Sequence, residues 1–196
     1  MIVEAIRNRV KEECVRDQNV LGPSFFEEHL EVVAQYGAEL AIRLGADAEI
    51  VALAAYLHDI SAVRDFSTLP THAQDSAEIA RHILDELGYP AERVERVAQC
   101  IRTHSSPLQT PGATPEQVCI SNADAIAQIV RPAFWCFIAY GVFRMNFEDG
   151  RRWQRERRER NWAAMIRPAQ KLAHEGYEVS LGFLRDVEPP LSALHS

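Results

Sequence analysis

The chain lacks a long apolar run, a recognisable leader and any closely spaced pair of cysteines. Its longest apolar candidate, Ala133 to Phe143, has about half of the ~20 residues that a membrane-spanning helix needs. The N-terminus has no basic region ahead of an apolar one, so a secretory signal is not expected. The cysteines are Cys14, Cys100, Cys119 and Cys136. Because no two of them form a CxxC pair, they favour reduced, buried thiols in a cytoplasmic protein over a disulfide frame or a zinc knuckle.

The chain also has fewer basic than acidic residues. The chain has 21 Lys and Arg against 28 Asp and Glu, which gives a formal net charge of -7. A general nucleic-acid-binding surface is therefore not expected, because phosphate backbones are held by positive surface. A small anionic substrate is not excluded, since a bound metal ion can neutralise it. The length of 196 residues suits one well-packed domain, predicted over residues 1–188, with a loose tail at residues 189–196.

Alternating apolar and polar residues are missing too, whereas apolar residues recur at helical spacing in nearly every segment. We therefore predict an all-α fold, a single helical domain of about seven or eight helices. Capping boxes are predicted at Ser24/Glu27, Thr71/Gln74 and Thr114/Gln117, and single N-caps at Asp47 and Asp149. The cap at Asp149 predicts one long final helix that buries residues from Trp162 to Leu172.

The dipeptide His58-Asp59 follows an apolar run, Ile50 to Leu57. An imidazole beside a carboxylate supplies two adjacent ligands for one hard or borderline metal ion. Further candidates near inward helical faces or helix ends are His29, His72, His104 and Asp124. Each histidine alone is more simply interpreted as a core residue or a helix-terminal cation, but the whole set favours a metal site between facing helices. His82 falls on a water-facing row of its helix instead.

The order of these residues in a helical context resembles the HD-domain superfamily of metal-dependent phosphohydrolases. The local strings that carry the resemblance are Leu57-His58-Asp59-Ile60, Thr71-His72 leading to Ser76-Ala77-Glu78-Ile79-Ala80, Ile101-Arg102-Thr103-His104, and Asn122-Ala123-Asp124-Ala125. The resemblance covers about residues 24–130 and leaves residues 132–188 as a C-terminal helical extension. It implies a hydrolase that uses metal-activated water on a nucleotide or another small phosphorylated metabolite.

The resemblance also implies a division of the ligands. The first metal would be bound by His29, His58, Asp59 and Asp124, with Asp59 able to bridge. In binuclear members His72 and His104 would hold a second metal, and in mononuclear members residues near them contact the substrate phosphate. Asp59, His72 and His104 are therefore the expected catalytic residues. The expected cofactor is one or two divalent ions among Fe, Mn, Co, Ni, Mg and Zn.

Two arginines are candidates for binding the substrate phosphate, namely Arg64 and Arg102. One family subgroup carries a lysine where this chain has Ala62, and Arg64 would supply the nearby positive charge. Two alternatives stay open, a diiron oxygenase built on the same helical core and a catalytically silent binding module. The sequence leaves open whether the chain forms a homo-oligomer.

An arginine-rich segment, residues 151–160, is the other conspicuous feature of the chain. It can be interpreted as an anion-binding or nucleic-acid-binding surface. The alternative is a solvated helix face with ion pairs four residues apart: Arg152-Glu156, Arg155-Glu159 and Glu156-Arg160. Because the whole chain is acidic, we favour the solvated face.

Overall fold

The computed structural model describes residues 1–106 and 110–185. The α-helices are α1 (Ile2–Cys14), α2 (Glu31–Leu44), α3 (Ala48–Leu57), α4 (Ile60–Arg64), α5 (His72–Glu86), α6 (Ala91–Thr103), α7 (Pro115–Val130), α8 (Pro132–Cys136), α9 (Phe147–Ala164) and α10 (Arg167–Phe183). Two π-helical segments, Phe26–Leu30 and Phe137–Val142, and a 3-10 segment, Phe66–Thr71, lie between them. The described residues contain no strand, so the all-α prediction is confirmed. The predicted loose tail at residues 189–196 lies outside the described residues.

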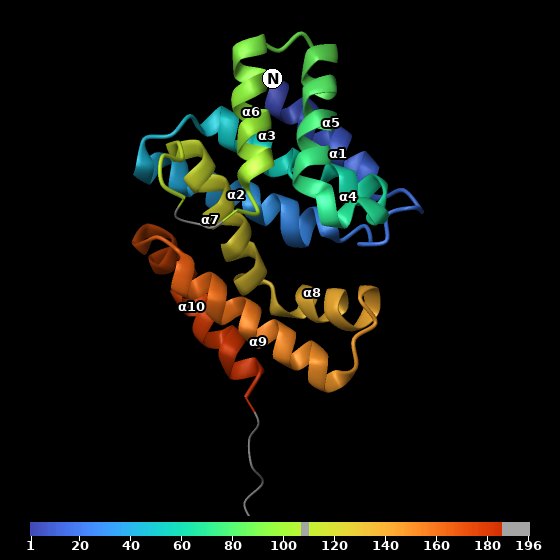
Figure 1. The fold of residues 1–196 in the computed structure, drawn as a ribbon, viewed down its shortest axis with the longest axis vertical. Coiled ribbons are helices and arrows are strands. Elements are labelled where there is room, and N and C mark those ends of the chain that lie inside the picture. The colour runs from blue at the N-terminus through green and yellow to red at the C-terminus, as the bar shows by residue number, and fades with distance from the viewer. Residues whose placement is uncertain (107–109, 186–196) are drawn as a thin grey trace, which may run out of the picture.

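The helices form two groups that meet at α7 (Figure 1). In the larger group α3 contacts α1, α2, α6 and α7, while α5 packs against α6. The smaller group contains α8, α9 and α10, which lie beyond the far end of α7 in the view of Figure 1. Helices α9 and α10 pack on one another, and both also contact α7. Helix α7 therefore belongs to both groups.

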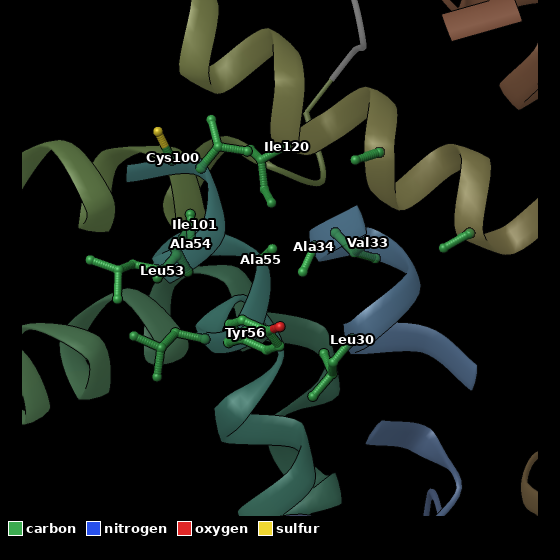
Figure 2. Close-up of a cluster of buried hydrophobic side chains, with 14 of the residues drawn as sticks. Leu30, Val33, Ala34, Leu53, Ala54, Ala55, Tyr56, Cys100, Ile101 and Ile120 are labelled. Carbon is green, nitrogen blue, oxygen red and sulfur yellow. The ribbon is translucent and has the colours of Figure 1, made fainter. Parts of the chain in front are cut away.

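Helix α3 is the central element because its sequence is apolar on every side. Asp47 accepts hydrogen bonds from the backbone of Glu49 and Ile50 and so starts the helix, as predicted. From Leu53 to Leu57 every residue is buried. Figure 2 shows side chains of α3 among those of α2, α6 and α7, including Leu53, Ala54 and Ala55. A helix that is apolar all round is stable only when it is surrounded in this way.

Helix α7 starts at the predicted capping box, in which the Thr114 and Gln117 side chains and backbones bond reciprocally. The helix ends before Pro132, which cannot continue its hydrogen-bond ladder. The chain then turns by 84° between Pro115–Val130 and Pro132–Val142. Only as a bent pair do these two segments have the length and apolarity of a membrane span, and no single described helix does.

Three predicted side-chain caps do not form, although α5 begins directly after Thr71 as predicted. Glu27 does not return to Ser24 but pairs with Lys11 of α1 at 3.1 Å. At the start of α5 the Thr71 hydroxyl donates to Asp75, and Gln74 bonds Glu78. Helix α9 is capped by Asn146, whose side chain accepts from the backbone of Asp149, so Asp149 lies inside the first turn.

The predicted long last helix is two helices. Helix α9 ends at Ala164 and α10 begins at Arg167, with Pro168 in its first turn. Proline suits a first turn, where the missing N–H costs nothing, and it does not suit a helix interior. The break lets α10 turn back and pack along α9.

The solvated-face interpretation of residues 151–160 is wrong for part of the segment. Helix α9 is covered on one side by α10 and on another by the segment that follows α8. As a result Gln154 and Arg158 are fully buried, whereas Arg152 and Arg155 are exposed. Arg152 bonds Asp149 in the turn before it, rather than the predicted Glu156.

Candidate metal centre

His58 and Asp59 lie where α3 gives way to α4. His58 is the residue after the last one of α3 and is completely buried, and Asp59 precedes the first residue of α4. The surrounding helices bring the other candidates to this junction: His29 from the π-helical segment Phe26–Leu30, His72 and His104 from the ends of α5 and α6, and Asp124 from the middle of α7. All six predicted ligands are therefore in one place.

The six side chains form two groups that share Asp59. Oδ2 of Asp59 lies 3.3 Å from Nε2 of His58 and 3.6 Å from Nε2 of His29. Asp124 belongs to the same group, since its Oδ1 lies 3.4 Å from Nε2 of His29. On the other side, Oδ1 of Asp59 lies 3.6 Å from Nε2 of His72 and 3.7 Å from Nε2 of His104.

Three of the four imidazoles are oriented by hydrogen bonds to the backbone. Nδ1 of His58, His72 and His104 donates to the carbonyl oxygen three residues earlier, at 2.8, 2.7 and 2.6 Å. With Nδ1 carrying the proton, the neutral ring offers the lone pair of Nε2 to the shared centre. The Nε2 atoms face one another in pairs, at 3.2 Å for His29 and His58 and at 3.1 Å for His72 and His104.

His29 is held differently from the other three. It lies in a π-helical segment, and such wider turns recur at functional sites. Its Nδ1 is buried without a hydrogen-bond partner among the described residues. Its ring packs against Phe25 and edge-on against Trp135, with centroid distances of 4.9 and 5.6 Å. Aromatic packing therefore replaces the backbone hydrogen bond in setting the orientation of this imidazole.

These donors fit one or two divalent metal ions. Neither group contains a thiolate, so the set suits the metals that imidazole and carboxylate prefer. Each group offers three ligand atoms that lie within 4.8 Å of one another: His29, His58 and Asp59 in one, and Asp59, His72 and His104 in the other. A carboxylate that turns one oxygen to each group can bridge two ions.

The charges within the centre differ between the two groups. Burial works against a charge on His58, but the carboxylates of Asp59 and Asp124 outweigh it and raise the pKa of His58 to about 9. Burial opposes the charge of Asp59 as well, yet the imidazoles of His58 and His29 hold the pKa of Asp59 well below its usual range. Burial and the positive charge of His58 together lower the pKa of His104 to about 4. At neutral pH His58 of the metal-free centre is therefore positively charged, whereas His104 is neutral.

Metal binding at pH 7 is expected to release about one proton per chain, because a histidine must be neutral to bind a metal. Since the pKa of His58 is raised to about 9, the proton competes with the metal below that pH, and metal affinity should rise with pH up to about 9. Calorimetric titration of the metal-free protein in buffers of different ionisation enthalpy measures the release. A binding heat at pH 7 that is the same in all buffers would contradict the expectation.

Sequence reasoning missed Gln128, which lies one helical turn after Asp124 on α7. Its amide nitrogen donates to both carboxylate oxygens of Asp124, each at 2.9 Å. Its amide oxygen accepts from Nε of Arg157 at 2.7 Å and from the Asn161 side chain at 2.8 Å. The spacing of four residues from a ligand was the available signal, since it places both side chains on one helix face.

Gln128→Ala is expected to lower metal affinity by about 10- to 100-fold, as loss of a ligand-orienting hydrogen bond commonly does. The matched control is Gln35→Ala, which changes an exposed glutamine of α2. Competition against a fluorescent chelator measures the affinity of each variant. Equal affinities for the two variants would show that Gln128 does not hold Asp124 for the metal.

A cavity of about 640 Å³ opens beside the centre. Its wall includes His29, Asp59, His72, His104 and Asp124, together with Gln128, Arg157, Arg160 and Asn161. The remaining wall is largely apolar and contains Leu21, Phe25, Phe66, Leu69, Ile138 and Phe143. The ligand cluster is thus accessible to a molecule larger than water.

The structure does not bring Arg64 and Arg102 to this cavity. Arg64 is held by the buried carboxylate of Glu13 on α1, at 2.6 and 3.1 Å. Arg102 donates to Glu78 at 3.2 Å. Each guanidinium thus has an acidic partner elsewhere, and neither residue is part of the cavity wall. The arginines in that wall, Arg157 and Arg160, come instead from the segment interpreted as a solvated face.

The HD-domain family model matches residues 26–129, which are just over half of the chain. The protein belongs to the HD-domain family. HD domains bind divalent metals, and the matched range contains every ligand of the centre described above. The predicted family is therefore confirmed.

Solved structures share this HD fold over nearly the whole chain. A predicted HD superfamily hydrolase from an uncultured Thermotogales bacterium is 23% identical, with a TM-score of 0.65 over 92% of this chain and 88% of its own. Bacillus subtilis YpgQ, solved in complex with ADP, is 20% identical, with a TM-score of 0.68 over 93% and 94%. A Lactobacillus plantarum protein is 18% identical, with a TM-score of 0.70 over 93% and 92%. No curated protein matches the chain.

Proposed function

We propose that this HD-domain protein is a metal-dependent phosphohydrolase that acts on a nucleotide or another small phosphorylated metabolite. Family membership and the ligand cluster support the broader class, a metal-dependent hydrolase. The observation that carries the proposal is the carboxylate of Asp59, which turns one oxygen to each of two ligand groups at the wall of a cavity.

The chemistry follows from the arrangement of these side chains. A divalent ion bound here would lower the pKa of its water and supply hydroxide near neutral pH. Asp59 would hold the two ligand groups together during the reaction, because it is the one residue common to both. His72 and His104 complete the second group and face the cavity, where they can also contact substrate phosphate if only one ion is bound.

The size and lining of the cavity support a substrate larger than phosphate itself. The volume of about 640 Å³ is in the range of small-molecule sites, which are mostly apolar with a few polar groups placed for orientation. Here the polar groups are the ligand cluster and the arginines of α9, and the apolar wall would contact the organic part. The complex of Bacillus subtilis YpgQ with ADP is in keeping with a nucleotide.

The proposal is tested by a panel of phosphomonoesters, phosphodiesters and nucleotides, each assayed with Mn, Co, Ni, Mg, Zn and Fe. Turnover of at least one class is expected, and its loss on chelation should be reversed by the metal. Absence of turnover on every substrate, with bound metal demonstrated in the same preparation, would overturn the proposal.

A second candidate is a diiron oxygenase, and the specific observation in its favour is the same bridging position of Asp59 between two histidine groups. Oxygen consumption by an iron-loaded preparation in the presence of an organic substrate would support it. Binding of only one metal per chain would exclude it. A catalytically silent binding module is the less favoured alternative, since such a protein has no need of all six ligands.

A further inference from the structure

Arg157 is an arginine of α9 whose guanidinium packs against two indole rings. Its central carbon is 4.5 Å from the ring centroid of Trp135 and 4.9 Å from that of Trp153. Nε donates to Gln128, which in turn donates to the ligand carboxylate of Asp124. The side chain is thus held by two aromatic rings and by the hydrogen bond at Nε before any ligand binds.

The two terminal nitrogens of the guanidinium have no hydrogen-bond or ion-pair partner among the described residues. Among residues 1–106 and 110–185, the only hydrogen bond of the Arg157 side chain is the one to Gln128, and no carboxylate lies within ion-pair distance. Burial lowers the pKa of Arg157, because a buried cation without a paired anion is unfavourable. Four N–H donors on the two terminal nitrogens are left for a molecule in the cavity that Arg157 lines.

The neighbouring Arg158 shows what a structural arginine looks like in the same helix. Arg158 is not part of the cavity wall and is more deeply buried than Arg157. Its guanidinium donates to the Ser180 hydroxyl, to the backbone oxygen of Gln154 and to the Gln154 side chain. Every nitrogen of Arg158 is therefore used to join α9 to α10 and to its own preceding turn, whereas the fork of Arg157 is unused.

We infer that Arg157 binds the phosphate group of the substrate through its two terminal nitrogens, a role that rests on the function proposed above. A planar fork held against two aromatic rings matches the oxygens of a phosphate, and little side-chain freedom is lost when it binds. The attachment to Asp124 through Gln128 places this fork next to the metal ligands. Arg157 is accordingly a substrate-binding residue, contributed by the part of the chain outside the matched HD domain.

Arg157→Met tests the inference, because methionine keeps an unbranched apolar chain against the indoles and removes the charge. With the wild-type metal content retained, the dissociation constant for inorganic phosphate, measured by calorimetry on the metal-loaded protein, should rise about 10- to 100-fold. The KM for a phosphate ester should rise in parallel, with a smaller change in kcat. Arg157→Lys should fall between wild type and Arg157→Met, since it keeps the charge and loses the fork.

Arg152→Met is the matched control, because Arg152 lies on the same helix, is exposed and lies outside the cavity wall. It should bind phosphate as the wild type does. Phosphate affinity that is unchanged in Arg157→Met, or absent in the wild type, would overturn the inference, and so would loss of the metal in Arg157→Met. Weaker phosphate binding without turnover of any ester would uphold the role of Arg157 and refute the proposed function. Turnover with a wild-type KM in Arg157→Met would uphold the proposed function and refute the role of Arg157.

Discussion

Asp59→Ala is expected to remove essentially all bound metal and to reduce turnover by at least about 10³-fold, which corresponds to the several kcal/mol that a catalytic ion contributes. One carboxylate serves both ligand groups, with oxygens 3.3 to 3.7 Å from the histidine nitrogens on either side. Its loss also leaves the positive charge of His58 without its nearest counter-ion. Elemental analysis after dialysis against a weak chelator measures the metal, and the best substrate of the panel measures turnover.

The matched control for Asp59→Ala is His82→Ala. His82 lies on the same helix as His72 but on its exposed side, so metal content and turnover should be nearly unchanged. Helical circular dichroism should be the same for both variants and the wild type. Retention of the full metal content by Asp59→Ala would contradict the shared position of this carboxylate.

His104→Ala should lower the metal content from two ions to one per chain while the group of His29, His58 and Asp124 keeps its ion. His104 is one of only two histidines in the second group, and the loss leaves Asp59 and His72 with too few ligands for a stable site. Turnover should fall steeply, because the bridged pair no longer exists. His72→Ala removes the other histidine of that group and should behave alike.

A mononuclear centre would give a different result for His104→Ala and His72→Ala. If the wild type binds a single ion, and His104→Ala and His72→Ala both keep it, the centre is mononuclear. Turnover would then fall through lost contacts to the substrate phosphate, and the bridging role of Asp59 would be refuted. Anomalous scattering from crystals of the wild type would locate the ions independently.

The metal ligands could be predicted from the sequence because they depend on few residues of strong character. An apolar run that must be buried on all sides ends in His58-Asp59, so these two side chains had to lie inside the fold. Helix periodicity separated His72 from the exposed His82. The resemblance to a known family then ordered the remaining ligands along the chain.

What could not be predicted depended on partners that are distant in the sequence. The capping box predicted at Ser24 does not form, and Glu27 pairs instead with Lys11 of another helix. In the same way, arginines of residues 151–160 look alike in the sequence, and only packing of α9 against its neighbours separates Arg157, in the cavity, from the exposed Arg152. Arg64 was misplaced because its partner, Glu13, lies on α1, outside the region of family resemblance.

The amide of Gln128 has a thermodynamic consequence for the whole site. It holds a metal ligand, Asp124, with its nitrogen and the inferred phosphate ligand, Arg157, with its oxygen. When metal binding orders Asp124, or phosphate binding orders Arg157, the conformational freedom of the other side chain is reduced through Gln128. Linkage then requires reciprocity: the factor by which bound metal tightens phosphate binding equals the factor by which phosphate tightens metal binding. Such an enzyme would hold its metal most firmly while it is occupied by substrate or product, and would be most open to exchange of the metal between turnovers.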